Sequence, residues 1–527
     1  MTGPDEKIIT TSEMHNVEIL ADQHGLSYAS MMERAAAGLT KVVHKAAVKF
    51  NGNTHILGLA GKGNNGGDCL LSLAQIASEG LVASVFCYGR NLQIDPLVLK
   101  AQSAGVHVID AVPVSIQEWF MQNSSQKIIL VDGLLGTGFS GELNQDTRQI
   151  LKSLKECLSN CEYQVIAVDC PSGTNCDTGE VSQETLRADM TVCLAAVKVG
   201  LLKSPANAYS GTLEVVDIGL GSVLPGWPDS LVNVITERYS AGLLPVRSAN
   251  AHKGSFGKVL VTGGSARYLG ALSLCLQAAA RTGAGLVTGA STNQVIGMIA
   301  SHLPDSTWIP LQGNVEGQLD HRAAISLSRE FAQYSAMAFG PGMGVSPDTI
   351  AFVDQTLSEF YGISQVPIVV DADGLKCLTE IPEWWKRIRG EAILTPHPGE
   401  MRRLTGLSEE EIRADRIGTT RKYAVLWQKI VILKGAFSVI SSPEGQVWVS
   451  PYATSALSHA GSGDVLTGII AGYLAQKLDA LQAAILGVTI HAISAILAYK
   501  EIGCEDSVLA SDLVRYIPRA IAKLRAQ

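Results

Sequence analysis

The stretch "SHAGSGDVLTGIIAG", Ser458 to Gly472, places a glycine-rich turn directly before an apolar run with helical spacing. Glycines let the backbone at a helix N-terminus close around an anionic group, and the N–H dipoles there stabilise developing negative charge. Gly461, Ser462 and Gly463 would form such a phosphoryl-binding turn. Asp464, the first carboxylate after the turn, is placed to take a proton from an attacking hydroxyl. The alternative is that Asp464 only complements the positive end of the helix dipole.

The opening segment ends a series of short runs rich in valine, isoleucine and leucine, which alternate with helical patterns. This alternation is typical of βαβ units and a parallel sheet. The strand candidates of this second series are residues 257–265, 284–291, 335–344, 367–375, 392–400 and 429–440. The following "SSPEGQVWVS", Ser441 to Ser450, predicts a hairpin because Pro-Glu-Gly separates two apolar runs.

An earlier series of the same kind occupies the first part of the chain. Its strand candidates are residues 55–61, 82–89, 127–136, 164–173 and 211–221. Proline, glycine and serine then concentrate in "SVLPGWPDS", Ser222 to Ser230, which is typical of a linker. We therefore predict an α/β protein with two doubly wound domains, at residues 1–220 and 230–527, joined by a linker at 221–229.

Composition supports two folded domains and excludes several classes of protein. At 527 residues the chain exceeds what one hydrophobic core usually supports, and 46% hydrophobic against 17% charged residues indicates a globular protein. The net charge of −8, with no basic block, argues against a nucleic-acid partner. Ten scattered cysteines without a C-x-x-C pair and the lack of an apolar leader predict a cytoplasmic protein with reduced thiols. The apolar run Leu481 to Tyr499 contains polar residues, so we expect a buried helix and no membrane partner.

The first series carries polar residues at the ends of its strands. "GLAGKGNNGGDCLLSLAQ", Gly58 to Gln75, is a glycine-rich strand-to-helix turn, where a pyrophosphate can be held. Asp132 ends one strand, and Asp169 and Ser172 follow another; the carboxyl ends of parallel strands converge on one crevice. Asn65, Asp132 and Ser172 offer oxygen atoms to a hard cation, which leaves Asp169 free for proton transfer. The alternatives are that each aspartate is a cap and that the glycines serve tight geometry alone.

Together with "MMERAAAGL", Met31 to Leu39, these motifs resemble the NAD(P)H-hydrate epimerase domain, which is Rossmann-like, over about residues 10–220. The resemblance implies substrates that are hydrated dinucleotides, NADHX and NADPHX. It implies a potassium ion held by Asn65, Asp132 and Ser172, and a catalytic, substrate-binding Asp169. The substrate-binding residues that it implies are Asn64, Asn65, Gly66, Gly67, Asp68, Gly136, Thr137, Gly138, Phe139, Ser140, Gly141, Glu142 and Asp169. Cys69 replaces a glycine that is usual in the family; it lies just past the motif and puts little in doubt.

The chemistry that this resemblance implies is inversion of C6 of the hydrated nicotinamide ring, the carbon that carries the added hydroxyl. The ring nitrogen can assist either loss of that hydroxyl or opening of the ring. Both routes need a proton shuttle such as Asp169. The sequence leaves both routes open.

The second series lacks the G-x-x-x-x-G-K-[ST] loop of P-loop kinases. Its motifs "AHKGSFGKVLVTGGS", "GPGMG", "DADGL", "TPHPGE" and "AGSGDVLTGIIAG" resemble the ribokinase-like superfamily, and more narrowly the ADP/ATP-dependent NAD(P)H-hydrate dehydratase, over roughly residues 230–527. The resemblance implies that Gly342, His397 and Asp464 bind the hydrated dinucleotide. It implies that Lys434, Gly435, Ala436, Phe437, Ser438 and Gly463 contact the adenine nucleotide, whose phosphates carry magnesium. Ser462 stands in place of a frequent threonine and Gly374 in place of a frequent alanine.

The implied reaction phosphorylates the C6 hydroxyl of the S epimer, with Asp464 as general base. Phosphate then leaves and a C5 proton is lost, which restores NADH or NADPH. The resemblance favours ADP as phosphoryl donor and a homo-oligomer, but no residue selects ADP over ATP or NADHX over NADPHX, and channelling stays open. The alternative is a small-molecule kinase of the ribokinase superfamily with a non-catalytic N-terminal binding module. The joint presence of Asn65, Asp132, Asp169 and Ser172 argues against such a module.

Overall fold

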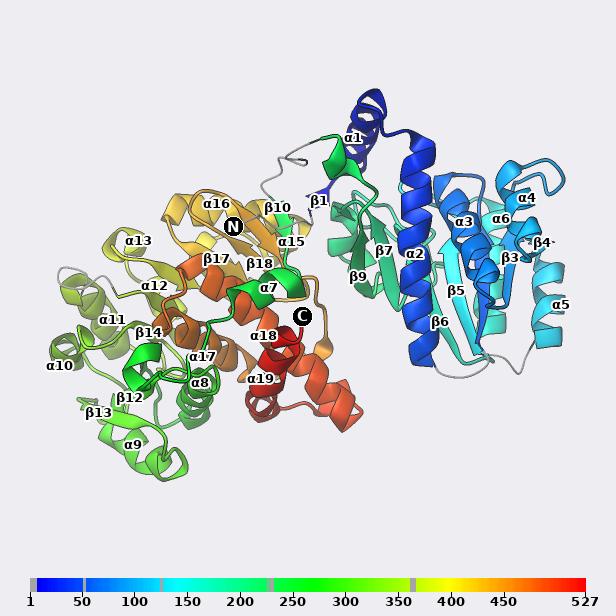
Figure 1. The fold of residues 1–527 in the computed structure, drawn as a ribbon. Coiled ribbons are helices and arrows are strands. Elements are labelled where there is room, and N and C mark those ends of the chain that lie inside the picture. Colours follow the sequence, from blue (N-terminus) through cyan, green and yellow to red (C-terminus); the bar gives the residue numbers. More distant parts are fainter. Residues whose placement is uncertain (1–6, 51–53, 124–126, 225–226, 228–231, 361–365) are drawn as a thin grey trace. The chain divides into compact units, whose positions relative to one another are not determined.

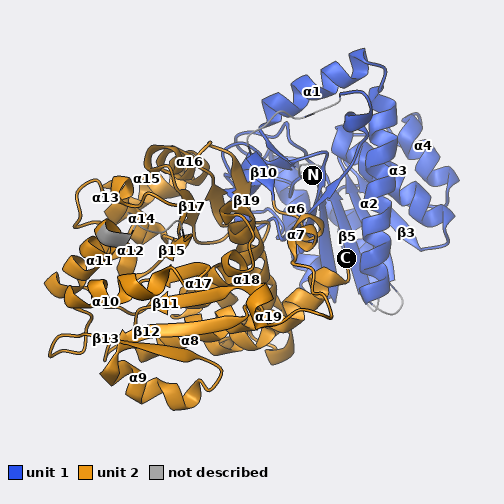
Figure 2. Ribbon diagram, turned by 60° about the vertical axis from the view of Figure 1, so that its left-hand side comes forward, with its two compact units in different colours: residues 1–234 blue, residues 235–527 orange. Residues whose placement is uncertain are grey.

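A computed structural model describes residues 7–50, 54–123, 127–224, 227, 232–360 and 366–527 (Figure 1). The chain divides into two compact units, Met1–Val234 and Ile235–Gln527 (Figure 2). The division falls a few residues beyond the predicted linker. Of that linker, residues 225–226 and 228–229 lie outside the described residues, and a 3₁₀ turn spans Leu220–Ser222.

Unit 1 is built on a parallel sheet with the strand order β4-β3-β2-β5-β6-β7-β9. The strands are β2 (Thr54–Ala60), β3 (Ala83–Cys87), β4 (His107–Asp110), β5 (Lys127–Gly133), β6 (Tyr163–Val168), β7 (Met190–Leu194) and β9 (Thr212–Val216). Short β1 (Ile8–Ile9) and β8 (Val197–Lys198) pair with each other, and β10 (Val232–Val234) ends the unit. The strand order reverses between β2 and β5, the place where α/β sheets bind ligands.

Helices cover both faces of this sheet. They are α1 (Thr11–Gln23), α2 (Tyr28–Phe50), α3 (Asn64–Ser78), α4 (Pro96–Ser103), α5 (Pro113–Asn123) and α6 (Gln145–Leu158). Successive residues of β5 point to opposite faces: Ile129 and Val131 belong to the core formed with α2 and α3. Ile128 and Leu130 belong to the core formed with α5 and α6. This alternation explains why strands buried on both sides read as unbroken apolar runs, and it confirms the doubly wound prediction.

Unit 2 contains a second sheet, in the order β19-β18-β17-β16-β15-β14-β11-β12-β13. The strands are β11 (Lys258–Thr262), β12 (Leu286–Thr292), β13 (Thr307–Leu311), β14 (Ala336–Phe339), β15 (Ile368–Val370), β16 (Ala392–Leu394), β17 (Ile430–Leu433), β18 (Val439–Ser441) and β19 (Val447–Val449). All pairs are parallel except β17–β18 and β18–β19, so the hairpin prediction is confirmed. The order reverses between β11 and β14.

The single strand predicted for residues 429–440 is wrong, because the structure breaks it into β17 and β18. Gly435 and Phe437 between them have φ angles of 141° and 52°. Positive φ is incompatible with an extended strand, and the chain reverses here. The segment that was predicted to bind nucleotide is therefore a turn at the carboxyl end of β17.

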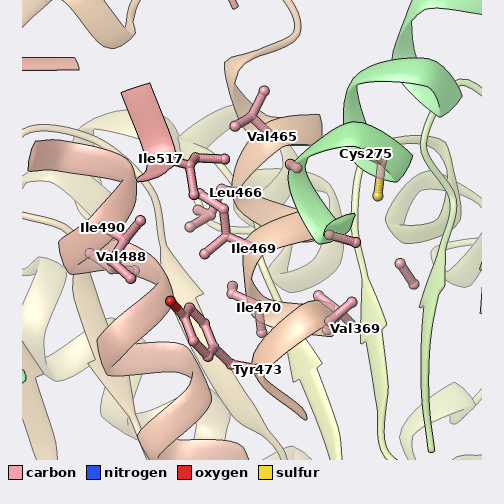
Figure 3. Close-up of a cluster of buried hydrophobic side chains, with 14 of the residues drawn as sticks. Cys275, Val369, Val465, Leu466, Ile469, Ile470, Tyr473, Val488, Ile490 and Ile517 are labelled. Carbon is pink, nitrogen blue, oxygen red and sulfur yellow. The ribbon is translucent and has the colours of Figure 1, made fainter. Parts of the chain in front are cut away.

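The opening segment forms α17 (Ser462–Ala475), whose side chains are almost all buried. The other helices of unit 2 are α7 (Glu237–Leu243), α8 (Leu269–Arg281), α9 (Asn293–Ile299), α10 (Arg322–Phe331), α11 (Pro347–Phe360), α12 (Asp373–Leu378), α13 (Trp384–Arg387), α14 (Pro398–Thr405), α15 (Glu409–Ala414), α16 (Arg416–Trp427), α18 (Ala480–Ile502) and α19 (Ala510–Arg525). Figure 3 shows side chains of α17 packed with residues of α8, α18 and α19. A helix buried on all sides is apolar all round, as the sequence is here.

Helix α18 has the length and composition of a membrane span. In the structure 78% of its apolar window is buried inside the protein. Its side chains join the same core as those of α17, in agreement with the prediction of a buried helix.

We expect Gly468→Ala in α17 to lower the free energy of unfolding by about 1–3 kcal/mol, the usual effect of overpacking a core. A Cβ atom at Gly468 would clash with the carbonyl oxygen of Cys275 in α8 and lie 2.8 Å from the Cβ of Ala278. Denaturant unfolding measures the change. Gly297→Ala in α9 is the matched control, because a Cβ there meets no atom within 4 Å. Equal stability of the two variants would contradict the close packing of α17 on α8.

Candidate active sites

The unit 1 site lies at the reversal point of the sheet, where the loops after β2 and β5 meet. A Cβ at Gly61 would clash with the carbonyl oxygen of Leu134, and a Cβ at Gly66 with that of Gly61. These glycines therefore serve close backbone approach, as the alternative interpretation held. Gly63, the N-cap of α3, has open space around it and no side-chain cap. The first N–H groups of α3 are thus available to an anion.

The three residues predicted to bind a cation are held by hydrogen bonds and close contacts at the carboxyl ends of β5 and β6. The Asn65 side-chain amide donates to the carbonyl oxygen of Val168 at 2.6 Å, and its Oδ1 lies against Gly136. The hydroxyl of Ser172 donates to Asp132 Oδ1 at 2.6 Å, and its N–H donates to Oδ2 at 2.9 Å.

Asp132 is fully buried, and burial raises the pKa of its carboxyl although the hydrogen bonds from Ser172 oppose this. No cationic side chain pairs with it in the part of the chain that the structure describes. A buried carboxylate hydrogen-bonded to a hydroxyl group offers oxygen ligands of the kind that hard cations take. The described residues also contain no group of three His, Cys, Asp or Glu side chains that could hold a metal ion.

Asp169 has a φ angle of 65°, a conformation that is strained for residues other than glycine and is concentrated at functional sites. Its Oδ1 accepts the N–H of Leu194 at 2.8 Å and is ion-paired with the ammonium group of Lys198. Lys198 is fully buried. Burial alone would lower the pKa of Lys198, but the charge of Asp169, its hydrogen bond and the nearby thiols of Cys193 and Cys176 together outweigh burial, and the pKa is raised.

Two further carboxyl groups act on this pair. Asp68, in the first turn of α3, is only 3% exposed, and burial, with the charges of Asp169 and Glu18, raises its pKa well above the usual range. Burial also raises the pKa of Glu18 of α1, although Lys198 opposes this. The protonated form of Asp68 is therefore favoured more than that of an exposed aspartate, and in that form the carboxyl can donate a hydrogen bond.

The second glycine loop, residues 136–142, turns back on itself, with the N–H of Phe139 donating to the carbonyl oxygen of Gly136 at 3.0 Å. Phe139, Gly141 and Glu142 line a cavity of about 630 Å³ together with residues of the loop after β6. The first turn of α3 does not line this cavity among the described residues. The two predicted substrate-binding segments approach each other where the side chain of Asn65 lies against Gly136.

In unit 2 all the predicted residues except Phe437 and Gly342 line one cavity of about 550 Å³ at the carboxyl ends of β15, β16 and β17. The cavity is lined by His397, Lys434, Gly435, Ala436, Ser438, Gly461, Ser462, Gly463 and Asp464. The φ angle of Gly461 is 93°, which turns the chain into α17. A Cβ at Gly463 would lie 3.1 Å from Lys434 Nζ, so a lysine ammonium group reinforces the anion-binding turn.

A network of carboxylates surrounds that ammonium group. Lys434 Nζ donates to Asp371 Oδ1 at 2.7 Å, and the Thr467 hydroxyl donates to Asp371 Oδ2 at 2.7 Å. Burial and then the charge of Asp371 raise the pKa of Asp464 to about 7, against the effect of Lys434. Burial likewise raises the pKa of Glu400 to about 7. Asp464 is therefore poised to exchange a proton near neutral pH.

Two histidines hold the ends of helices at this cavity. His491 of α18 lies 2.9 Å through Nε2 from the carbonyl oxygen of Ser462, and burial lowers its pKa to about 4, so it is neutral at pH 7. His397 caps α14, since its Nδ1 accepts the N–H groups of Gly399 and Glu400 at 3.0 and 3.3 Å. Its Nε2 is 3.5 Å from a Glu400 oxygen.

Two of the predicted residues do not line the cavity, and a third lines it while its hydroxyl is hydrogen-bonded within the protein. Phe437 has a buried side chain and does not line the cavity. The Ser462 hydroxyl donates to the carbonyl oxygen of Leu457 at 2.8 Å, so its backbone rather than its hydroxyl faces a ligand. Gly342, with φ at 62°, lies outside the cavity at the β11–β14 reversal point, where its carbonyl oxygen accepts the Ser265 hydroxyl at 2.9 Å.

Curated proteins related to this chain match it from end to end. The bifunctional NAD(P)H-hydrate repair enzyme Nnr of Moorella thermoacetica is 32% identical, with 99% of this chain and 97% of that protein covered. The enzyme of the same name from Dictyoglomus turgidum is 32% identical, with 98% of each chain covered. The chain belongs to the bifunctional NAD(P)H-hydrate repair enzymes.

Two family models match the repair-enzyme chain, one within each of its two units. The model described as YjeF-related protein N-terminus matches residues 28–200, in unit 1, and the model described as NAD(P)H-hydrate dehydratase matches residues 259–519, in unit 2. A solved structure of ADP/ATP-dependent NAD(P)H-hydrate dehydratase from Bacillus subtilis, co-crystallised with ATP and Mg²⁺, is 30% identical. It covers 55% of this chain and 97% of its own, with a TM-score of 0.47.

Sequence reasoning about the repair enzyme missed several polar residues that the structure brings to the two sites. They are Glu18 and Lys198 in unit 1, and Asp371, Glu400 and His491 in unit 2. Lys198 has one usable signal, because it is a lysine inside the apolar run "CLAAVKVGLL", Cys193 to Leu202. Asp371 and Glu400 lie within the motifs "DADGL" and "TPHPGE" but were given no individual role.

Proposed function

We propose that unit 1 interconverts the R and S epimers of NADHX and NADPHX, and that unit 2 dehydrates the S epimer with consumption of ADP. End-to-end similarity to the repair enzymes supports both activities. The observation that carries the proposal is the geometry of unit 2, where Asp464, with a pKa near 7, follows an anion-binding turn that Lys434 reinforces.

In unit 2, Asp464 takes the proton of the C6 hydroxyl as the hydroxyl oxygen attacks the terminal phosphorus of ADP and AMP leaves. The turn at Gly461–Gly463 holds the transferred phosphoryl group. Loss of the C5 proton then forms the C5–C6 double bond as the C6–O bond breaks and phosphate departs. A hydroxyl is a poor leaving group and a phosphate a good one, which explains why a kinase-type site would serve a dehydration.

Magnesium, when bound with the nucleotide, supplies positive charge to its phosphates. Asp371 and Glu400 line the same cavity and carry the oxygen ligands that Mg²⁺ prefers. Lys434 is paired with Asp371 and lies 4.0 Å from Glu400, so we assign its side chain to the phosphates rather than to the adenine. The backbone of the turn Gly435–Ser438 remains for the adenine nucleotide.

In unit 1, Asp169 moves the proton at the C6 hydroxyl or ring nitrogen, and the carboxyl of Asp68, in its protonated form, would donate a hydrogen bond to the substrate. Potassium would be held by Asn65, Asp132 and Ser172, where it would neutralise the buried Asp132 and fix the loops after β5 and β6. A cytoplasmic location and a homo-oligomeric state remain predictions from the sequence.

The proposal is tested by incubating the purified protein with mixed-epimer NADHX and ADP, or ATP, and following NADH absorbance and free phosphate. Complete conversion of both epimers in potassium buffer is expected, and conversion of the S fraction alone in sodium buffer. A stable phosphorylated product without NADH would instead support the small-molecule kinase. Conversion of only half the mixture in potassium would remove the epimerase assignment.

We expect the dehydration rate of the S epimer to fall as the pH drops through about 7. The pKa of Asp464 is raised to about 7, so the base form is lost below that pH. The kcat for NADH formation, measured over roughly pH 5.5 to 9, should decline about tenfold per unit on the acid side. Lys434→Met should move this limb to higher pH, because Lys434 lowers the pKa of Asp464. A flat wild-type profile between about pH 6 and 8 would exclude Asp464 as the base.

A further inference from the structure

Lys198 is a fully buried lysine with all its hydrogen-bonding capacity used. Its ammonium group donates to Asp169 Oδ1, to the carbonyl oxygen of Leu194 at 2.8 Å and to that of Ala196 at 3.1 Å. A lysine ammonium group has three N–H donors, and here three acceptors receive them. Burying such a charge is unfavourable unless it is paired and hydrogen-bonded, so the position of Lys198 is tightly defined.

Leu194, the last residue of β7, is hydrogen-bonded to both Asp169 and Lys198. Its N–H donates to Asp169 Oδ1 at 2.8 Å and its carbonyl oxygen accepts from Lys198. Oδ1 of Asp169 therefore has two donors. Oδ2 has no donor among the described residues. The carboxylate is therefore held through Oδ1, and Oδ2 is left without a hydrogen bond from the protein.

Lys198 interacts with several carboxyl groups but is paired directly with one of them, Asp169. Glu18 of α1 and Asp68 of α3 are the other carboxyl groups that interact with it, and burial raises the pKa of both. Among the described residues this ammonium group forms its direct ion pair with Asp169 alone. The position of Lys198 therefore fixes Asp169 in particular.

We infer that Lys198 is a positioning residue for epimerisation, which holds Oδ1 of Asp169 so that Oδ2 faces the substrate as a fixed base. The inference rests on the proposed epimerase function. It also accounts for the strained φ angle of Asp169, since the ion pair and the Leu194 hydrogen bond hold the residue in that conformation.

The test is Lys198→Met in the full-length protein, with conversion of R-NADHX to the S epimer measured directly by chromatography. We expect kcat to fall by roughly 100-fold, the effect of misplacing a catalytic group by about 1 Å, with KM little changed. Dehydration of the S epimer in unit 2 should be unchanged. Lys127→Met is the matched control, because Lys127 pairs with Glu162 at the amino end of β5, away from the site.

The split between kcat and KM separates positioning from simple stabilisation. Loss of a purely structural lysine would lower the melting temperature and leave the kcat of the folded protein unchanged. Loss of a positioning lysine lowers kcat in protein that is still folded at the assay temperature, because Asp169 Oδ1 loses the ammonium group that holds it.

Lys198→Gln, which keeps N–H donors without charge, is the second variant if methionine prevents folding; a smaller loss of kcat is expected. Epimerisation with the wild-type kcat in both variants would overturn the inference alone. A wild-type protein that does not epimerise R-NADHX would overturn the proposed function and the inference with it.

Discussion

Asp464→Asn should abolish nucleotide-dependent recovery of NADH from the S epimer, with kcat reduced by about 10²–10⁴-fold. An asparagine amide has nearly the shape of the carboxylate but cannot accept the proton of the C6 hydroxyl. The substitution also removes a charge from the cluster of Asp371, Glu400 and Lys434, so the cavity loses repulsion as well as its base. We therefore expect the fold of unit 2 to persist while turnover stops.

The measurement is NADH formation from purified S-NADHX with ADP, together with direct assay of R-to-S conversion by the same protein. Epimerisation should be unaffected by Asp464→Asn. Asp479→Asn is the matched control, because Asp479 caps the next helix, α18, through the N–H of Gln482 at 2.8 Å and does not line the cavity. Loss of both activities in Asp464→Asn would argue against two independent sites.

The same variant decides between the two interpretations of Asp464 in the sequence. A carboxylate that only complements the dipole of α17 is worth about 0.3–1 kcal/mol, and its removal would lower stability with little change in rate. A general base would show the reverse pattern. The cavity position and the raised pKa of Asp464 favour the base.

Local patterns made much of the fold predictable. Strands such as β2 and β5 are buried on both faces and are therefore unbroken apolar runs, and the glycines after them mark turns at their carboxyl ends. Residues at those ends, Asp132 and Asp169 among them, could be proposed as site residues because strand ends of a parallel sheet converge.

The strands that were missed include the central strand β7 and the edge strands β4 and β13. Edge strands β4 and β13 include exposed or half-exposed residues, and their sequences "HVID" and "TWIPL" have no apolar run between turn signals. The break between β17 and β18 depends on positive φ at Phe437, which no property of phenylalanine predicts.

The parts of the two sites that could not be predicted from the sequence are ion pairs between residues far apart in the chain. Lys198 is 29 residues from Asp169, and Lys434 is 63 residues from Asp371. Spacing of this kind carries no periodic signal, because the partners meet only when separate βα units are placed side by side in the sheet. The strand-end residues could be picked out from the sequence, but the ion pairs that hold them could not.

Asp169→Asn should abolish epimerisation, by about 10²–10⁴-fold in kcat, while dehydration of the S epimer continues. The reason is that an amide cannot take up and return the proton at Oδ2. Asparagine tolerates the left-handed backbone conformation that Asp169 adopts, so the local fold should be kept. Normal turnover of R-NADHX by this variant would remove Asp169 from its catalytic role.

Stability distinguishes the catalytic effect of Asp169→Asn from its structural effect. The substitution leaves the buried ammonium group of Lys198 without a counter-charge, and breaking a buried ion pair from one side lowers the free energy of unfolding by about 3–5 kcal/mol. The double variant Asp169→Asn with Lys198→Met removes both charges and should recover most of that stability. It should recover no epimerisation, because the proton acceptor is still missing. A double variant that regained activity along with stability would show that Asp169 acts by holding the fold together and not by moving a proton.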